Sequence, residues 1–200
     1  MHINISVCKD SKNIFCDEDT KRLLSTYAEN FIAGIMKHAK GMTCIMNPIV
    51  NSYKRLVPGF EAPMYISWST QNRSPLIRVP AARGESTRIE IRSADSAANP
   101  YLALAVCLKA GLSGIRENMS PLPEINYDIF SLDSETLRTL NMDSIPLSLR
   151  SAINEMRQDE MIKETLGDHI FERYISYKQQ EWCEYRNIVT QWELDKYLKN

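Results

Sequence analysis

Residues 51–101 read NSYKRLVPGFEAPMYISWSTQNRSPLIRVPAARGESTRIEIRSADSAANPY, and this segment spreads six arginines between short apolar runs. Glu61 and Glu90 lie among these arginines. The spacing differs from that of an ordinary solvated face of charged residues. The segment is therefore the first candidate for a functional site.

The pentapeptide at residues 88–92, RIEIR, alternates as a β-strand does. Successive side chains of a strand point to opposite faces, so Arg88, Glu90 and Arg92 share one face. Two isoleucines share the other face, which is then core. The charged face fits two interpretations, a cross-strand ion network on the solvent side or part of a binding site.

The neighbouring arginines favour the binding site. Arg73 and Arg78 lie beside prolines and β-prone residues, and Arg55 precedes a Pro-Gly turn. Guanidinium groups bind phosphate and carboxylate oxygens bidentately. A glutamate among them suits a hard cation such as Mg²⁺, which is usually shared with substrate phosphates. The segment thus predicts a combined anion and metal site.

Length and composition narrow the class of protein. The chain has 200 residues, a hydrophobic fraction of 44% and a formal net charge of −1. These values fit one ordinary globular domain or part of a larger one. A net charge near zero argues against general nucleic-acid binding, which needs a basic excess.

The cysteines and the hydropathy pattern indicate the cellular compartment. Five cysteines without CxxC spacing suit a reducing cytosol better than disulfides or a zinc site. No apolar run reaches the roughly 18 residues that a membrane span needs, and the first residues lack the charged-then-apolar pattern of a signal peptide. We expect a cytoplasmic protein with neither nucleic acid nor membrane as a partner.

Hydrophobic periodicity predicts the secondary structure. A polar loop is expected at residues 9–18, and a helix that is buried all round at residues 101–112, capped by Asn99. Gly41 is expected to cap the first helix, with His38 as a cation near its C-terminal end. Strands are predicted at residues 1–7, 64–69, 76–79 and 87–93, and helices at residues 20–40, 101–112, 135–140, 149–166, 169–188 and 191–198.

Two local signals shape the C-terminal part. Gly167 and Asp168 form a stop-and-cap pair, and Thr190 with Glu193 forms a capping box. The aromatic residues between 171 and 197 could stack on a base or a ligand. A role in the core or in a subunit contact is favoured over stacking.

Four sequence segments together resemble one enzyme family. They are MHIN at 1–4, NPIVNSYKRLVPGFEAP at 47–63, NRSPLIR at 72–78 and RIEIRSADSAANPYLALA at 88–105. They are similar to the C-terminal half of the catalytic domain of type I glutamine synthetase. The C-terminal EWCEYRNIVTQWELDKYL resembles, more loosely, the ending of the shorter, non-adenylylated branch of that family.

The resemblance implies an α+β fold, with a curved antiparallel sheet flanked by helices. It divides the chain into residues 1–116, the active-site half of the sheet domain, and residues 117–200, a helical part of the same domain. The family's N-terminal domain and early catalytic strands are expected to be absent, so the chain is expected to be a fragment that is inactive alone. Family members assemble as ring-shaped dodecamers.

The resemblance also implies a reaction and its reactants. In the family, ATP phosphorylates the γ-carboxylate of glutamate, and ammonia then displaces phosphate from γ-glutamyl phosphate. Mg²⁺ or Mn²⁺ and a set of arginines neutralise the transferring phosphoryl group, as this step demands.

Site roles follow by resemblance, residue by residue. Glu61 resembles the flap glutamate that closes over the acyl phosphate. The other two expected catalytic residues are Arg73 and Arg92. The implied sites are His2 and Glu90 for metal; Asn4, Ser6, Arg73, Arg78 and Arg88 for ATP; and Arg55, Glu61 and Arg92 for glutamate.

Two other functions remain open. The chain could be a non-catalytic regulatory or interaction module derived from glutamine synthetase, because half a metal site does not hold two cations against their hydration. It could also belong to a γ-glutamyl-amine ligase of the same fold, with another amine in place of ammonia.

Overall fold

The computed structural model describes residues 1–57, 62–129, 132, 136 and 142–198. The expected flap residue Glu61 lies outside the described residues, as does the helix expected at residues 135–140 apart from Thr136. Among the described residues, none of the helices combines the length and the apolar character that crossing a membrane requires.

A four-stranded sheet forms the centre of the molecule, in the order β1 (Ile3–Ile5), β6 (Ile89–Ile91), β5 (Ile77–Arg78) and β4 (Trp68–Ser69). The first three strands are antiparallel, and β4 joins β5 in parallel. The predicted isoleucine face of β6 is core, with Ile89 and Ile91 buried. The expected α+β class is confirmed.

The strands are shorter than alternation predicted, because other pairings replace the ladder. Ile66 donates its N–H to the Asp143 carbonyl, and Ile145 donates to Met64, so most of the strand expected at 64–69 pairs with the chain near residue 144 instead. Only Trp68–Ser69 joins the sheet.

The loop expected at residues 9–18 contains a hairpin of β2 (Cys8–Lys9) and β3 (Lys12–Asn13). Its two turn residues, Asp10 and Ser11, have φ of 50° and 64°. Two positive φ values are typical of a type I′ turn, whose twist matches that of the paired strands. The polar composition of this segment had predicted a loop and gave no sign of the two short strands.

Helix α1 (Thr26–Met46) differs from the predicted helix at both ends. It begins late because Leu23 has φ 54° and Ser25 caps the helix, accepting a bond from the Ala28 N–H. It passes through Gly41, and a Cβ there would lie 2.4 Å from Asp159 Oδ2. Gly41 therefore does not end α1; its lack of a side chain leaves space for the side chain of Asp159.

His38 is likewise not a C-terminal cation of α1. Its Nδ1 lies 2.9 Å from Asp159 Oδ2, and Asp159 accepts a hydrogen bond from the Met161 N–H at the start of α6 (Glu160–Arg186). Asp159 thus ends α5 (Leu149–Gln158) and begins α6, which divides the helix predicted at residues 149–166.

Helix α3 (Pro100–Arg116) begins as predicted, with Asn99 capping its first turn. It crosses α1 closely, since a Cβ on Gly34 would lie 2.1 Å from the Ala110 carbonyl oxygen. The expectation that this helix is buried all round is wrong for one face. Four large side chains on it are exposed: Tyr101, Leu104, Leu108 and Leu112.

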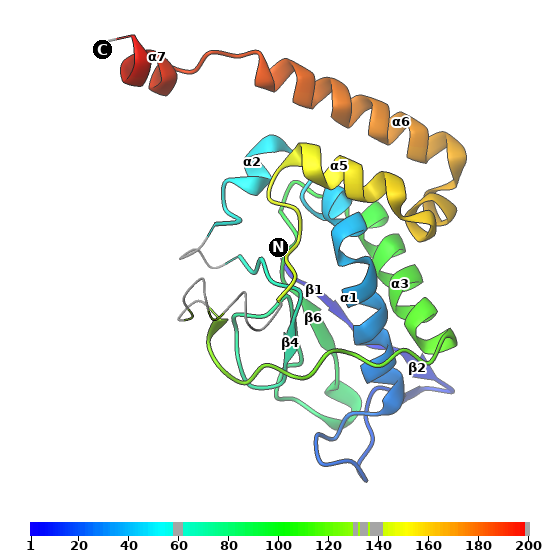
Figure 1. The fold of residues 1–200 in the computed structure, drawn as a ribbon. Helices are drawn as coiled ribbons and strands as arrows, with labels where there is room; N and C mark the ends of the chain where they lie inside the picture. The colour runs from blue at the N-terminus through cyan, green and yellow to red at the C-terminus, as the bar shows by residue number, and fades with distance from the viewer. Residues whose placement is uncertain (58–61, 130–131, 133–135, 137–141, 199–200) are drawn as a thin grey trace.

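Figure 1 shows α1 and α3 side by side next to the sheet, with α5 above them and α6 leading away to α7 (Gln191–Tyr197). Gly167, with φ 71°, interrupts α6 where the stop signal was predicted, and the Thr190–Glu193 capping box opens α7. Short helical turns are α2 (Val50–Tyr53) and η1 (Gly84–Ser86). The division at residues 116 and 117 stays a prediction.

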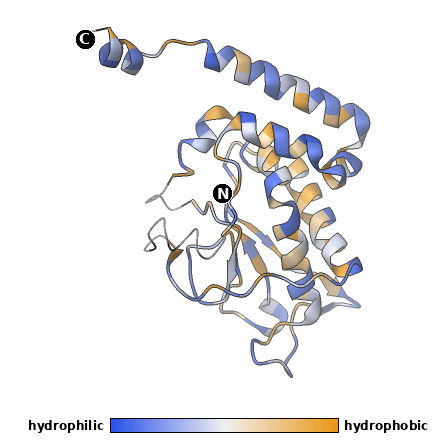
Figure 2. Ribbon diagram, viewed as in Figure 1, coloured by the Kyte–Doolittle hydropathy of each residue, from blue (hydrophilic) through white to orange (hydrophobic). Residues whose placement is uncertain are grey.

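The aromatic residues of the C-terminal part divide between core and surface. Phe171 is buried and the Tyr174 hydroxyl donates to the Cys44 carbonyl, whereas Tyr177, Trp192 and Tyr197 are exposed. Figure 2 shows α6 and α7 as largely hydrophilic and the sheet and its facing helices as more hydrophobic.

Candidate functional site

The side chain of Glu90 is the centre of the site. It lies in the middle of β6, opposite Asn4 of β1 on one side and Arg78 of β5 on the other. Directly opposed residues of paired strands place their side chains on the same face. Only 8% of the Glu90 side chain is exposed.

Three cationic or protonatable side chains converge on this carboxylate. His2 Nδ1 lies 2.6 Å from Glu90 Oε1, and an Arg78 terminal nitrogen lies 2.9 Å from Oε2. Arg92 Nε lies 3.5 Å from Oε1. We call His2, Arg78, Glu90 and Arg92 the Glu90 cluster. A buried carboxylate requires such pairing, because an unpaired buried charge is costly.

Arg88 does not pair with Glu90, although its side chain contacts Asn4, which lies opposite Glu90 on the same face of the sheet. Its Nε donates to Asn4 Oδ1 at 3.2 Å, and a terminal nitrogen donates to the Ser86 carbonyl at 3.2 Å. Asn13 fixes the chain before Arg88, since its amide donates to the Glu85 and Thr87 carbonyls. Asn4 and Arg88 thus form a polar pair beside the cluster.

Arg55 is held by three groups from two separate segments. Its Nε donates to Asp95 Oδ2 at 3.1 Å, a terminal nitrogen donates to Asn47 Oδ1 at 2.7 Å, and the same nitrogen donates to the Ser93 carbonyl. Burial raises the pKa of Asp95, but the hydrogen bond from the Ala97 N–H and the charge of Arg55 outweigh it, so the pKa is lowered. Asp95 is therefore a stable counter-ion for Arg55.

Two other expected site residues that the structure describes, Ser6 and Arg73, are not brought into the Glu90 cluster. Ser6 and Arg73 are exposed, and neither side chain forms a hydrogen bond or ion pair with the rest of the described chain. Glu61 lies outside the described residues. Asn47 and Asp95, the residues that hold Arg55, were missed by sequence reasoning even though both lie in or beside the quoted motifs.

The donor set of the Glu90 cluster fits one edge of a divalent metal site. Imidazole nitrogen and carboxylate oxygen are both metal ligands, and His2 and Glu90 bring one of each to the same point. The described residues contain no group of three or more His, Cys, Asp or Glu side chains that could hold a metal. A bound cation would need further oxygen donors from outside this pair.

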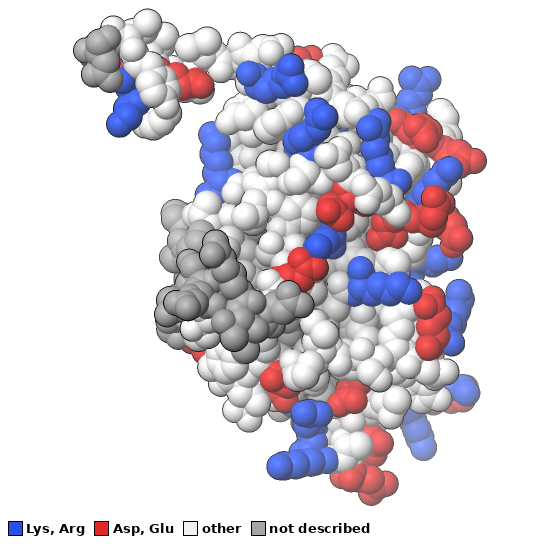
Figure 3. Space-filling model, in the orientation of Figure 1, with Lys and Arg blue, Asp and Glu red and all other residues white. Residues whose placement is uncertain are grey.

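The charged residues do not form a single-sign surface. On the face shown in Figure 3, acidic and basic side chains are intermingled.

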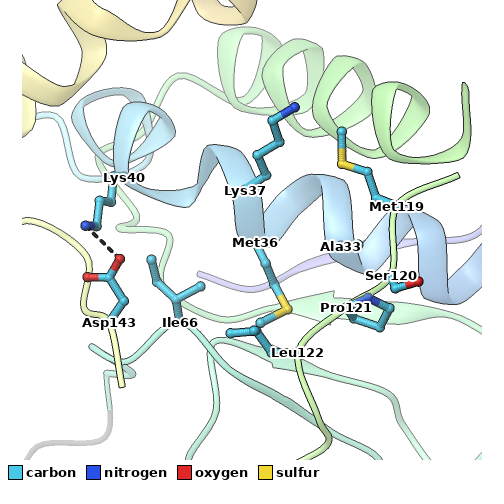
Figure 4. A pocket seen from close by; sticks show the side chains of 10 residues that line it. All are labelled: Ala33, Met36, Lys37, Lys40, Ile66, Met119, Ser120, Pro121, Leu122 and Asp143. Carbon is cyan, nitrogen blue, oxygen red and sulfur yellow. Dashed lines mark ion pairs between the residues drawn. The ribbon is translucent and has the colours of Figure 1, made fainter. Parts of the chain in front are cut away.

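A cavity of about 500 Å³ lies between α1 and residues 119–122, and Figure 4 shows the side chains of Met36 and Leu122 pointing toward each other there. Both of its lysines already have carboxylate partners, Lys40 with Asp143 at 2.7 Å and Lys37 with Glu117 at 3.1 Å.

Curated relatives are similar to the whole chain. It is 50% identical to a glutamine synthetase from Clostridium saccharobutylicum over 198 residues, which cover 99% of the chain and 45% of the relative. It is also 50% identical to a glutamine synthetase from Methanosarcina mazei, again over 99% of the chain and 44% of the relative. The chain spans about half the length of the curated relatives it matches.

Solved structures agree with these relatives. The GmaS/ADP complex has a TM-score of 0.88 and 32% sequence identity, with 100% of this chain and 46% of that chain covered. GmaS without ligand has a TM-score of 0.85 at 32% identity, with 100% of this chain and 44% of that chain covered. The sequence model of the glutamine synthetase catalytic domain matches residues 1–197. The chain therefore belongs to the glutamine synthetase family and corresponds to part of its catalytic domain.

Proposed function

We propose that this chain supplies part of the active site of an ATP-dependent glutamate–ammonia ligase, which forms glutamine through γ-glutamyl phosphate. The observation that carries the proposal is the buried Glu90 carboxylate with His2 and Arg78 on its two oxygens. The glutamine synthetases that are 50% identical to the chain support the same reaction.

The nucleotide end of the proposed site lies at β1 and β6. Arg78 and Arg88 provide guanidinium groups for the phosphates of ATP, with Arg73 joining from the loop between β4 and β5. Asn4 and Ser6 provide neutral polar contacts to the nucleotide. The 32% identical GmaS was solved in complex with ADP, which supports nucleotide binding on this fold.

His2 and Glu90 would be ligands of Mg²⁺ or Mn²⁺. The cation supplies neutralisation of phosphate charge when it is bound. The protein contributes the orientation of both ligands: Glu90 is fixed by Arg78 from the neighbouring strand, and His2 is placed by the start of β1. Arg92 adds a permanent positive charge on the same carboxylate.

The glutamate end of the proposed site uses Arg55 and Arg92. Arg55 binds the substrate's carboxylate, and its fixed orientation on Asp95 and Asn47 reduces the ordering cost of that contact. Arg92 faces the reacting carboxylate. Glu61 closes over the acyl phosphate and accepts a proton from bound ammonium.

The wider setting is also part of the proposal. We assign residues 1–116 to the active-site half of the catalytic domain and residues 117–200 to its helical part. The protein is cytoplasmic and assembles with further copies of the subunit, as the dodecamers of the family do. The exposed aromatic residues Tyr177, Trp192 and Tyr197 are suited to a subunit contact.

A second candidate function is a non-catalytic module with the same surface. The observation that favours it is the small donor set, since His2 and Glu90 are the metal ligands that the described residues bring together. Mg²⁺ binds poorly without a fuller set of oxygen ligands. A γ-glutamyl-amine ligase of the same fold stays a third candidate, because the Glu90 cluster does not specify the amine.

The first test measures binding and turnover on the purified chain. Mn²⁺ with ATP should bind, as detected by electron paramagnetic resonance, and Glu90→Gln should weaken the binding about tenfold. The exposed Glu172 on α6 gives the matched control, because Glu172→Gln removes a carboxylate far along the chain from the cluster. Equal affinities for the two variants would contradict the assignment of Glu90.

The second test is the hydroxamate assay with glutamate, hydroxylamine, ATP and Mg²⁺. The chain alone should form no γ-glutamyl hydroxamate, and turnover that Glu61→Ala abolishes would overturn this expectation. Reading the DNA upstream of the Met1 codon separates the two candidate functions. An in-frame glycine-rich NGSG-type segment and an ExE pair support the ligase, and their absence there supports the non-catalytic module.

A further inference from the structure

A polar cavity of about 720 Å³ lies away from the Glu90 cluster. It forms where the loop before α1, at the bottom of Figure 1, meets the chain that follows β4 and β5. These two strands are parallel, so their C-terminal ends open at the same edge of the sheet. We call this space the loop cavity.

The loop cavity has an excess of positive charge. Lys21, Arg22 and Arg83 line it, together with the two carboxylates Glu29 and Glu124. Arg22 lies 3.0 Å from Glu124 and 3.3 Å from Glu29, so it serves both carboxylates. Within the part of the chain that the structure describes, Lys21 and Arg83 have no carboxylate within ion-pair distance.

Arg83 is held in place without being neutralised. Its Nε donates to the Arg22 carbonyl at 3.1 Å, and a terminal nitrogen donates to the carbonyls of Pro80 and Ala82. Carbonyl oxygens orient a guanidinium but leave its full positive charge.

The loop that carries Lys21 and Arg22 is preformed. The Thr20 hydroxyl donates to the Leu24 carbonyl at 2.8 Å and accepts from the Leu24 N–H at 3.0 Å. The Leu23 N–H donates to the Thr20 carbonyl at 3.0 Å. A ligand that binds here would not have to order this loop, which lowers the cost of binding.

The cavity between α1 and residues 119–122 provides a contrast. It also contains two lysines, but Lys37 is paired with Glu117 and Lys40 with Asp143. Figure 4 shows the second of these pairs as a dashed line. An anion entering that cavity would have to displace an existing ion pair. The loop cavity offers uncompensated cations instead, together with neutral donors such as Gln71.

We propose that the loop cavity binds a small metabolite through a phosphate or carboxylate group, with Arg83 and Lys21 as its cationic contacts. Guanidinium groups bind both kinds of oxyanion in the same fork geometry. The volume is within the 300 to 1,000 Å³ typical of small-molecule sites. No residue that lines the cavity belongs to the Glu90 cluster, so the proposal is independent of the ligase activity.

The test uses the intact chain and inorganic phosphate or succinate as probes, at constant ionic strength. The chain has three tryptophans, and Arg22 lies 5.6 Å from the ring of Trp68, so the indole N–H signal of Trp68 reports on the cavity. We expect this signal to shift in nuclear magnetic resonance titrations while the signals of Trp182 and Trp192 stay unchanged. Isothermal titration calorimetry gives the dissociation constant.

Arg83→Gln should raise the dissociation constant about tenfold, and Lys21→Gln several-fold. Arg150→Gln, a change at an exposed arginine of α5, is the matched control and should leave it unchanged. Lys21 is exposed and has no described partner, so its variant tests the proposal even where Arg83→Gln disturbs folding. A response to phosphate alone identifies a phosphate ester, and a response to succinate alone identifies a carboxylate.

Two results would overturn the proposal. One is the absence of any Trp68 shift with either probe. The other is binding that survives Arg83→Gln and Lys21→Gln but is lost in Arg73→Gln, because the anion would then occupy the arginines proposed for ATP. That second result would leave the proposed ligase site intact and remove only the loop cavity.

Discussion

Two glutamates of this chain are almost equally buried, yet different kinds of group bind their carboxylates. The side chain of Glu90 is 8% exposed and that of Glu124 is 6% exposed. Glu124 accepts hydrogen bonds from the backbone N–H and the hydroxyl of Thr70, and from Arg22. Glu90 is paired with the side chains of His2, Arg78 and Arg92.

The difference separates a structural carboxylate from the carboxylate that we propose as a metal ligand. A backbone N–H cannot leave Glu124 without disturbing the chain after β4, so this carboxylate is part of the fold. The partners of Glu90 are side chains, and 47% of the His2 side chain is exposed. A cation can therefore exchange with these partners without rebuilding the backbone.

The largest expected effect is the loss of Glu124. Glu124→Ala leaves the Thr70 N–H without its acceptor and removes one partner of Arg22, and we expect it to lower the free energy of unfolding by about 3 kcal/mol. Urea unfolding followed by circular dichroism measures this change. Glu164→Ala, at an exposed carboxylate of α6, is the control. If Glu124→Ala lowered the free energy of unfolding no more than the control does, Glu124 would not be a structural carboxylate.

The same carboxylate should make stability depend on pH. Burial raises the pKa of Glu124, but the hydrogen bonds from Thr70 and the charge of Arg22 outweigh it and lower the pKa. A lowered pKa contributes stability that is present above the unfolded value of about 4.3 and is lost as pH falls through the folded value. The stability gap between the native chain and Glu124→Gln should therefore narrow below about pH 4.3; a gap that is constant from pH 7 to pH 3 would refute this.

A smaller effect on stability is expected at Glu90. Glu90→Gln removes a buried charge but keeps the shape of the side chain and one accepting oxygen, so we expect a loss of about 1 kcal/mol. Chemical denaturation of this variant beside Glu124→Gln sharpens the comparison. If Glu90→Gln proved the more destabilising of the two, Glu90 would be primarily structural.

The smallest effect is expected at His2. His2→Ala should change the free energy of unfolding by less than about 0.5 kcal/mol, because its side chain is about half exposed. It should nevertheless weaken Mn²⁺ binding about tenfold. Paired measurements of thermal unfolding and Mn²⁺ affinity check both statements, and a large stability loss with unchanged affinity would reverse the proposed role.

Features with a local cause could be predicted from the sequence. The alternation at residues 88–92 predicted both the buried isoleucines and the face that carries Glu90. Asn99 and Thr190 cap their helices because an N-cap depends on the residue itself and its next three neighbours. The family motifs added the roles of the site residues, which remain proposals.

Features that depend on distant residues could not be predicted. Gly41 resembled a helix stop, but its function is to make room for Asp159, which is far along the chain. The alternation at residues 88–92 did not predict that Arg88 donates a hydrogen bond to Asn4, which lies on another strand, and does not pair with Glu90. Asp95 lies 40 positions from Arg55, and only the fold brings the two together.

The close crossing of α1 and α3 has a consequence at the other end of these helices. Asn47 follows directly on α1, and Ser93 and Asp95 lie just before α3, so the cradle of Arg55 spans the ends of both helices. Gly34 and Gly114 bring the two backbones into contact, as a Cβ on Gly114 would lie 2.0 Å from the Asn30 carbonyl oxygen. A Cβ at Gly34 or Gly114 would therefore push the two helices apart. We expect that displacement to move Asn47 and Asp95, and with them the guanidinium of Arg55, which lies several helical turns away.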